Sequence, residues 1–161
     1  MNFFRFFIIA MLFAGGALAS DLQAKFQDWS VFMTNRGDKI LCYTMSLPIK
    51  LSSGEGRNSF LMVTNVENDA DEISLSSGVI YQKDSDVEMS FGDSKFNLLP
   101  VKARAWTYNK NDDIEIIKQM QNSSDVVISA ISEIHKNISE TYSLIGFSQA
   151  YKKMKEICKD K

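Results

Sequence analysis

Residues 28–46 read D-W-S-V-F-M-T-N-R-G-D-K-I-L-C-Y-T-M-S, and this stretch decides the fold class. Two runs rich in β-branched and aromatic residues, 28–34 and 39–46, flank the turn-forming residues N-R-G-D. This pattern predicts a β-hairpin in which Gly37 supplies the turn. We therefore interpret the R-G-D tripeptide as an ordinary turn rather than as an adhesion motif.

Runs of the same kind follow along the chain. They are S-F-L-M-V-T-N-V (59–66), E-I-S-L-S-S-G-V-I-Y (72–81), V-E-M-S-F (87–91), K-F-N-L-L (95–99), A-R-A-W-T-Y (103–108), D-V-V-I-S-A-I-S (125–132) and I-S-E-T-Y-S-L (138–144). In the run 72–81 the apolar residues alternate, with Gly78 at a bulge or bend. Short strands separated by turn residues predict a mainly β chain, an antiparallel β-sandwich or a barrel-like domain.

One short internal segment has the spacing of a helix. Ile114, Ile117 and Met120 recur every three residues and would form one apolar stripe. We expect Asp112 to be the N-cap, with Glu115 three residues later as in a capping box.

A second helix is predicted at the C-terminus, from about residue 147 to residue 159. Its apolar face would consist of Phe147, Ala150, Tyr151, Met154 and Cys158. Lysines occupy other positions, and we interpret them as a solvated face in preference to a partner-binding patch. These lysines are Lys152, Lys153, Lys155 and Lys159.

The first 19 residues read as an export signal. Arg5 is followed by the apolar run F-F-I-I-A-M-L-F-A, and small residues stand at Ala17 and Ala19, where cleavage after Ala19 is expected. The alternative is an uncleaved anchor, although the run is shorter than the roughly 20 residues that span a bilayer. Residues 20–161 then form a single β-rich domain.

Cys42 and Cys158 are the two cysteines of the chain. In an exported protein two cysteines are expected to pair, because such compartments are oxidising. The bridge would attach the C-terminal helix to the strand that contains K-I-L-C-Y. Two separate buried thiols are the alternative, and the spacing excludes a C-x-x-C redox pair.

The sequence offers little for catalysis. The one histidine, His135, lies in a predicted turn, and no nucleophile motif accompanies it. We expect no catalytic residue, no metal site and no cofactor. A formal net charge of −2 argues against a nucleic-acid binder. Trp29 and Trp106 are interpreted as core residues rather than as walls of a ligand pocket.

The order of several short motifs resembles the invasion-associated locus B family of exported bacterial proteins. The motifs are F-Q-D-W (26–29), L-C-Y (41–43), Arg57, F-L-M-V-T (60–64), S-S-G-V-I-Y (76–81), F-N-L (96–98), A-W (105–106), E-T-Y-S-L-I-G-F-S-Q-A (140–150) and Cys158. The family usually has aspartate where this chain has Glu140, and E-I-H-K-N before the last motif also departs from its pattern.

The resemblance implies a small, mostly β protein of the Gram-negative envelope, located in the periplasm or at the outer membrane or cell surface. It transfers no catalytic residue. We expect a non-enzymatic protein that binds an envelope or host protein and supports host-cell interaction or invasion. The alternatives are a periplasmic module for a small ligand or lipid, with a concave pocket lined by Trp or Tyr, and an unrecognised hydrolase.

Overall fold

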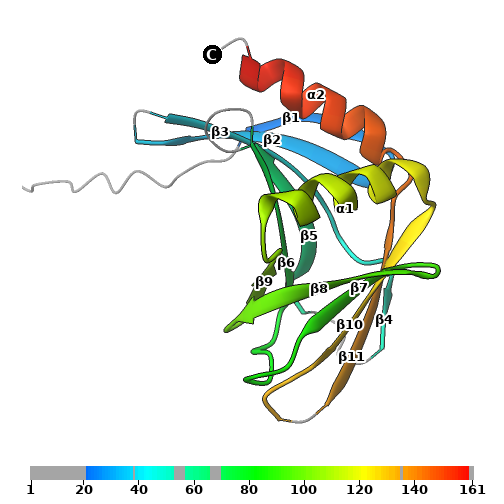
Figure 1. The fold of residues 1–161 in the computed structure, drawn as a ribbon. Helices are drawn as coiled ribbons and strands as arrows, with labels where there is room; N and C mark the ends of the chain where they lie inside the picture. Colours follow the sequence, from blue (N-terminus) through cyan, green and yellow to red (C-terminus); the bar gives the residue numbers. More distant parts are fainter. Residues whose placement is uncertain (1–20, 38, 53–56, 66–69, 135, 160–161) are drawn as a thin grey trace, which may run out of the picture.

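The computed structural model describes residues 21–37, 39–52, 57–65, 70–134 and 136–159. These residues form an eleven-stranded antiparallel sheet and two helices (Figure 1). The strands are β1 (Asp21–Phe26), β2 (Trp29–Arg36), β3 (Lys39–Ser46), β4 (Lys50–Leu51), β5 (Ser59–Asn65), β6 (Asp71–Ser77), β7 (Val87–Phe91), β8 (Ser94–Val101), β9 (Arg104–Trp106), β10 (Asp125–Ile131) and β11 (Asn137–Ser143). The helices are α1 (Lys110–Asn122) and α2 (Phe147–Lys159).

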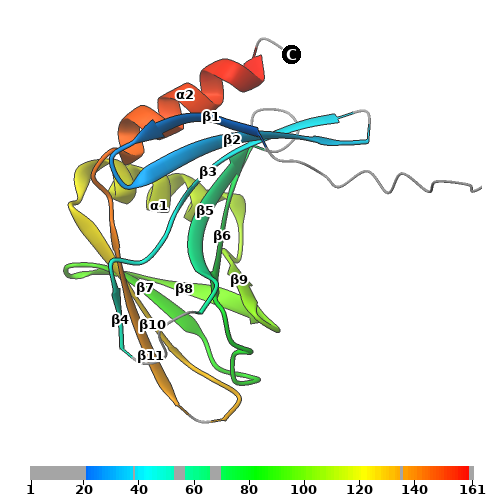
Figure 2. The same ribbon diagram turned by 180° about the vertical axis from the view of Figure 1, so that it is seen from behind.

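The strand order is β1-β2-β3-β5-β6-β9-β8-β7-β10-β11-β4. The sheet bends strongly, so that β10 and β11 lie across from β5 and β6, but its end strands β1 and β4 do not pair (Figures 1 and 2). The predicted antiparallel β fold with one internal and one C-terminal helix is therefore confirmed, while the sheet does not close into a barrel.

The core fills the concave side of the bent sheet. Alternate residues of each strand point inward, and α2 packs against β1, β2, β3 and β5 while α1 contacts β6 and α2. Fully buried inward side chains include Val31, Leu61, Leu75, Met89 and Ile128. The strand-like runs 125–132 and 138–144 are present as β10 and β11, which form an antiparallel hairpin paired from Asp125–Ser143 to Ile131–Asn137.

Helix α1 starts earlier than the sequence pattern predicted. Asn109 is its N-cap, and its side-chain oxygen accepts hydrogen bonds from the backbone N–H groups of Asn111 at 2.9 Å and Asp112 at 3.1 Å. The prediction that Asp112 caps this helix was wrong. Ile114 also fails as a core residue, because it is 52% exposed.

Asp113 explains which face of α1 is buried. Its Oδ1 accepts hydrogen bonds from the backbone N–H of Ile73 and the hydroxyl of Thr107, each at 2.9 Å. This carboxylate attaches the first turn of α1 to β6, and burial raises its pKa. The helix therefore presents Asp113, Ile116, Ile117 and Met120 to the core.

Helix α2 has the predicted bounds and face. Phe147, Ala150 and Met154 are buried, and the ring of Phe147 packs edge-on against Trp29 with centroids 4.8 Å apart. Cys158 forms a disulfide with Cys42, with a Cα–Cα distance of 6.0 Å. The predicted bridge between the last helix and an early strand is confirmed.

Two glycines allow the chain to turn where the motifs required it. Gly146 has φ +92, and a Cβ there would lie 2.0 Å from the carbonyl oxygen of Phe26. Gly78 has φ +66, and a Cβ would lie 2.8 Å from the backbone nitrogen of Asn58. The predicted bend at Gly78 is present, but it ends β6 at Ser77, so the strand does not continue to residue 81.

The predicted signal peptide and His135 lie outside the described residues. Within the described part of the chain, no helix is long and apolar enough to cross a membrane.

Candidate functional site

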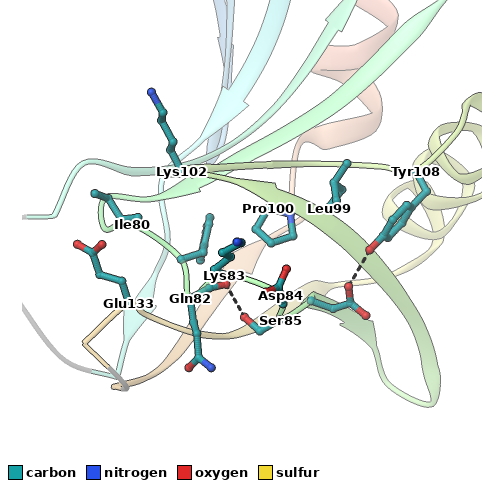
Figure 3. A pocket seen from close by; sticks show the side chains of 12 residues that line it. Ile80, Gln82, Lys83, Asp84, Ser85, Leu99, Pro100, Lys102, Tyr108 and Glu133 are labelled. Atoms are coloured by element: carbon teal, nitrogen blue, oxygen red, sulfur yellow. Dashed lines mark hydrogen bonds between the residues drawn. The ribbon is translucent and has the colours of Figure 1, made fainter.

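A surface cleft of about 570 Å³ lies where the segment after β6 crosses the end of the bent sheet. This segment is held on both sides: the backbone N–H of Tyr81 donates to the carbonyl of Lys102 at 2.9 Å, and that of Gln82 donates to the carbonyl of Ile131 at 2.8 Å. The cleft is lined by residues 80–86, by part of β8 and the β8–β9 turn, and by Tyr108 and Glu133 (Figure 3).

The rim of the cleft is apolar and exposed. Ile80 is 45% exposed, Leu99 44% and Tyr108 53%. The Tyr108 hydroxyl donates to Oδ1 of Asp86 at 2.7 Å, and this hydrogen bond raises the pKa of the phenol (Figure 3). The phenol is thus neutral at physiological pH and fixed by Asp86.

A second hollow of about 370 Å³ adjoins the first, since both are lined by Ile80 and Glu133. Its walls are largely aliphatic, with Val79, Ile134 and Ile138 among the lining residues. Arg57 also lines it. The side chain of Arg57 is only 11% exposed, and its Nε is buried without a hydrogen-bond partner among the described residues.

Behind this hollow lies a buried polar cluster centred on Glu140 of β11, which we call the Glu140 network. The Glu140 side chain is fully buried. Its Oε1 accepts from Arg57 Nη2 and from the Ser59 hydroxyl, both at 2.9 Å. Its Oε2 accepts from the hydroxyls of Ser77 and Tyr142, both at 3.0 Å. The network therefore joins β11 to β5 and β6 across the inside of the bend.

The phenols in this region are held in their neutral form. Burial is the main cause that raises the pKa of Tyr81 to about 12, and the Tyr81 hydroxyl donates to Ser77 at 2.9 Å. Burial, followed by the charge of Glu140, also raises the pKa of Tyr142. The neutral phenol of Tyr142 can donate to Glu140. With this bond each oxygen of Glu140 accepts two hydrogen bonds.

The hydrogen bonds of the Glu140 network favour a structural role for it. A carboxylate saturated by four donors and sealed from solvent has no proton or lone pair to offer a substrate. Ser59 and Ser77 donate to Glu140, but a carboxylate that also accepts from Arg57 and Tyr142 is a weak base for their protons. The network accordingly orders the walls of the second hollow through Arg57.

The sequence-predicted site residues fall in different places. Cys42 and Cys158 are joined, and Trp29 is in the core, where its Nε1 donates to the carbonyl of Ser143 at 2.9 Å. Trp106 is half-buried and pairs with Ser74 at an outward position of β9, so its assignment to the core was wrong. In the described residues no group of three His, Cys, Asp or Glu side chains could hold a metal ion.

The sequence did not predict the Glu140 network, although its residues belong to motifs of the family resemblance. These are Arg57, the S-S-G-V-I-Y motif with Ser77 and Tyr81, and the E-T-Y-S-L motif with Glu140 and Tyr142. The structure brings these separate motifs into one cluster.

Comparison with known proteins gives one informative result. No family model and no curated protein sequence matches the chain. Among solved structures, the crystal structure of invasion associated protein B from Bartonella henselae matches 87% of this chain and 99% of its own, with a TM-score of 0.66 and 12% sequence identity. The chain has the fold of that protein.

The likeness to invasion associated protein B confirms, at the level of the fold, the resemblance expected from the motifs.

Proposed function

We propose that this chain is an exported bacterial envelope protein that acts by binding another protein, without catalysis, and that this binding supports contact with host cells. The observation that carries the binding role is the exposed apolar rim of the two adjoining hollows. Exposed apolar groups around a concave surface are typical of interaction sites. The name of invasion associated protein B, whose fold this chain shares, supports the host-contact part.

The polar groups of the cleft favour binding of a partner over catalysis. Lys83, Lys102, Asp84 and Glu133 are among its lining residues, so both signs of charge border the apolar rim. Asp86 accepts the hydrogen bond of Tyr108 and orients its ring. Such a mixed rim around an apolar centre suits a protein partner.

The test is site-specific photo-cross-linking in intact cells, with a photoreactive residue in place of Ile80 or Ile134. These side chains are 45% and 65% exposed, so replacement leaves the core intact. The same residue in place of exposed Lys152 on α2 is the matched control. We expect one defined protein adduct from the cleft positions and none from the control. Identical adducts from all three positions, or none from the cleft, would contradict the proposal.

A strain that lacks the protein tests the biological part. We expect reduced association with host cells, with the wild-type chain restoring it and a chain with Tyr108→Ala and Ile80→Ser restoring it only partly. Normal envelope integrity together with normal host association would overturn the role in host contact.

A small-ligand or lipid-binding module is the second candidate. Tyr81 and Tyr108 line the larger cleft, and its volume of about 570 Å³ is in the range of ligand pockets. Native mass spectrometry of protein purified after export would reveal a co-purifying small molecule. A ligand retained by the wild-type chain and lost from Tyr108→Ala would favour this candidate over a protein partner.

A further inference from the structure

The side of the sheet that faces away from both helices has an unusual composition. Figure 2 shows this side of β1, β2, β3 and β5, and neither described helix crosses it. The strand pairing places seven large apolar side chains at outward positions, of which Leu22 is exposed and the others are half-buried: Leu22, Phe32, Leu41, Tyr43, Met45, Phe60 and Met62. A solvated face of an antiparallel sheet is expected to be polar at such positions. We call this surface the outer face.

These side chains form one layer rather than scattered exposed residues. Leu22 pairs with Phe32, which in turn pairs with Tyr43, and the rings of Phe32 and Tyr43 stack with centroids 5.1 Å apart. In the adjacent row Met45 pairs with Met62. A continuous apolar layer on a bare sheet face is typical of an interaction surface.

The apolar layer continues into the link between β3 and β4. Leu47 is 63% exposed and Ile49 is 54% exposed, and both border a hollow of about 380 Å³ that Phe32 and Met45 also line. Two exposed aliphatic side chains on a link between strands can enter another apolar phase without disturbing the sheet.

Basic residues surround the layer. The outward positions of β1, β2, β3 and β9 hold Lys25, Arg36, Lys39 and Arg104, and the guanidinium of Arg104 lies 5.0 Å from the ring centroid of Phe60. The acidic side chains next to this layer include Glu72 at an outward position of β6 and Asp28, which lines the same hollow as Phe32 and Met45. This face is thus basic, whereas the whole chain has a formal net charge of −2.

We propose that the outer face binds the surface of a bilayer rich in anionic phospholipid. Aromatic and aliphatic side chains ringed by lysine and arginine are the composition that partitions into the headgroup region of such bilayers. The basic side chains supply attraction to anionic headgroups. The apolar layer supplies the insertion, and no shape-matched groove is needed.

A second copy of the chain fits this surface less well. Two-fold self-pairing apposes the same patch of both copies, so the basic ring of one copy would meet the basic ring of the other. The proposal goes beyond the proposed protein-binding role and does not depend on it, because the outer face is separate from the cleft beneath Ile80 and Tyr108.

The experiment is vesicle flotation of the protein purified after export, with its disulfide intact. Vesicles of phosphatidylglycerol and phosphatidylcholine in equal amounts are compared with vesicles of phosphatidylcholine alone. We expect binding to the first kind that weakens as salt is raised and at least about tenfold weaker binding to the second. Equal binding to both kinds, or binding to neither, would overturn the proposal.

A charge-reversal pair locates the surface. Lys25→Glu, Arg36→Glu and Arg104→Glu together should weaken vesicle binding at least about tenfold. The control carries the same change of charge on the helices, with Lys118→Glu, Lys152→Glu and Lys159→Glu, and should bind within about twofold of wild type. Circular dichroism and the thermal midpoint verify that both variants are folded. Equal loss in both variants would show that net charge alone is responsible and would overturn the assignment to the outer face.

Trp106 provides a readout without any added label. It lies at an outward position of β9 and is half-buried, while Trp29 is fully buried in the core. Lipids brominated in the acyl chain should quench the fluorescence of the wild-type chain and leave that of Trp106→Phe unchanged. Failure to quench Trp106, or a dimer in sedimentation that the charge-reversal variant dissociates, would assign this face to something other than a bilayer.

Discussion

The two ends of the bent sheet are held in place by different kinds of interaction. At one end, α2 is fixed to β2, β3 and β6 by the Cys42–Cys158 disulfide, by the contact of Trp29 with Phe147, and by Asp71. We call this region the α2 clamp. At the other, the Glu140 network joins β11 to β5 and β6 by hydrogen bonds to a fully buried carboxylate.

The difference between these regions lies in the cost of losing one member. In the α2 clamp a covalent bond and apolar contacts act in parallel, and the side chains of the polar Lys155–Asp71 pair are 20% and 9% exposed. In the Glu140 network the charges of Glu140 and Arg57 are both shielded from water. A buried ion pair adds little net stability when intact, but the loss of one partner leaves the other uncompensated. Among polar contacts, those of the network are therefore expected to be the less tolerant of losing one partner, while the disulfide dominates the clamp.

The largest effect is expected from the disulfide, which closes a separation of 116 residues. Reduction should lower the free energy of unfolding by about 4 to 5 kcal/mol at most, because the unfolded chain regains loop entropy. Urea unfolding with and without reductant measures this change.

The control for the disulfide is the double variant Cys42→Ala and Cys158→Ala, on which reductant should have no effect. An unchanged urea midpoint of the wild-type chain after complete reduction would show that the apolar contacts of α2 suffice by themselves.

The next effect concerns the buried carboxylate. Glu140→Ala should lower the free energy of unfolding by about 3 to 5 kcal/mol, since Arg57 would remain buried without its counter-charge. Glu88→Ala is the matched control: the Glu88–Lys95 pair has the same kind of contact at 3.0 Å but is exposed. Its loss should leave the urea midpoint nearly unchanged, because an exposed ion pair contributes little to stability.

A double variant separates the contribution of charge compensation from the contribution of side-chain packing. Glu140→Leu with Arg57→Met should recover most of the stability lost in Glu140→Leu alone, because both buried charges are then removed. If the double variant is no more stable than the single one, the network contributes through its hydrogen bonds to Ser59 and Ser77 rather than through charge compensation.

The helix and the disulfide of the α2 clamp could be predicted from the sequence, whereas the Glu140 network could not. The interpretation of Lys155 as part of a solvated face was wrong, because Lys155 pairs with Asp71 and its side chain is 20% exposed. The spacing from Phe147 to Cys158 defines one helical face, and two cysteines in a chain with an export signal define their own partners. The first inference needs only the local periodicity of apolar residues, and the second needs only the number of cysteines.

The prediction of the N-cap of α1 also used local sequence alone, and it was wrong. Asn109 and Asp112 are both good N-cap residues, and the contact of Asp113 with β6 favours Asn109.

The Glu140 network depends on the order of strands in space. Arg57, Ser77 and Glu140 lie far apart in the chain and meet only because the sheet bends β11 across from β5 and β6. Nothing in the local sequence distinguishes an inward glutamate from the solvated one expected on a strand. The outward position of Trp106 has the same origin, because the parity of β9 is set by its pairing with β6 and β8.

Alkaline pH should weaken the Glu140 network through its buried phenols. The pKa of Tyr81 rises from 10.0 to about 12 on folding, mainly through burial. Below pH 10 both states carry the proton; between pH 10 and pH 12 the unfolded state loses it first, so the free energy of unfolding falls with rising pH. Two pKa units correspond to about 2 to 3 kcal/mol, and the raised pKa of Tyr142 acts in the same direction.

Urea midpoints between pH 9 and pH 11 measure the first half of this fall, and Tyr81→Phe should show a shallower one. Spectrophotometric titration of tyrosinate should find Tyr81 and Tyr142 protonated until the fold is lost. A stability that is flat over this interval would indicate that the phenols ionise without leaving the network.

The smallest effects come from one oxygen atom removed in each region. Tyr142→Phe deletes a donor to Glu140 in a fully buried site, and Tyr151→Phe deletes a donor to Asp71, at 2.6 Å, in a half-buried one. We expect losses of about 2 kcal/mol for Tyr142→Phe and about 1 kcal/mol for Tyr151→Phe. Urea unfolding of the two oxidised variants under one set of conditions gives both numbers.

The order of these two losses is the sharpest test of the contrast, because the chemical change is identical and only the surroundings differ. Asp71 keeps its two contacts with Lys155 at 3.1 Å, and water can replace the lost hydroxyl at that half-buried site. Glu140 Oε2 keeps only Ser77, in a site that solvent does not reach. If Tyr151→Phe proves the more costly, the short hydrogen bond to Asp71 outweighs the difference in burial, and the polar contact of the clamp stabilises the protein more than that of the network.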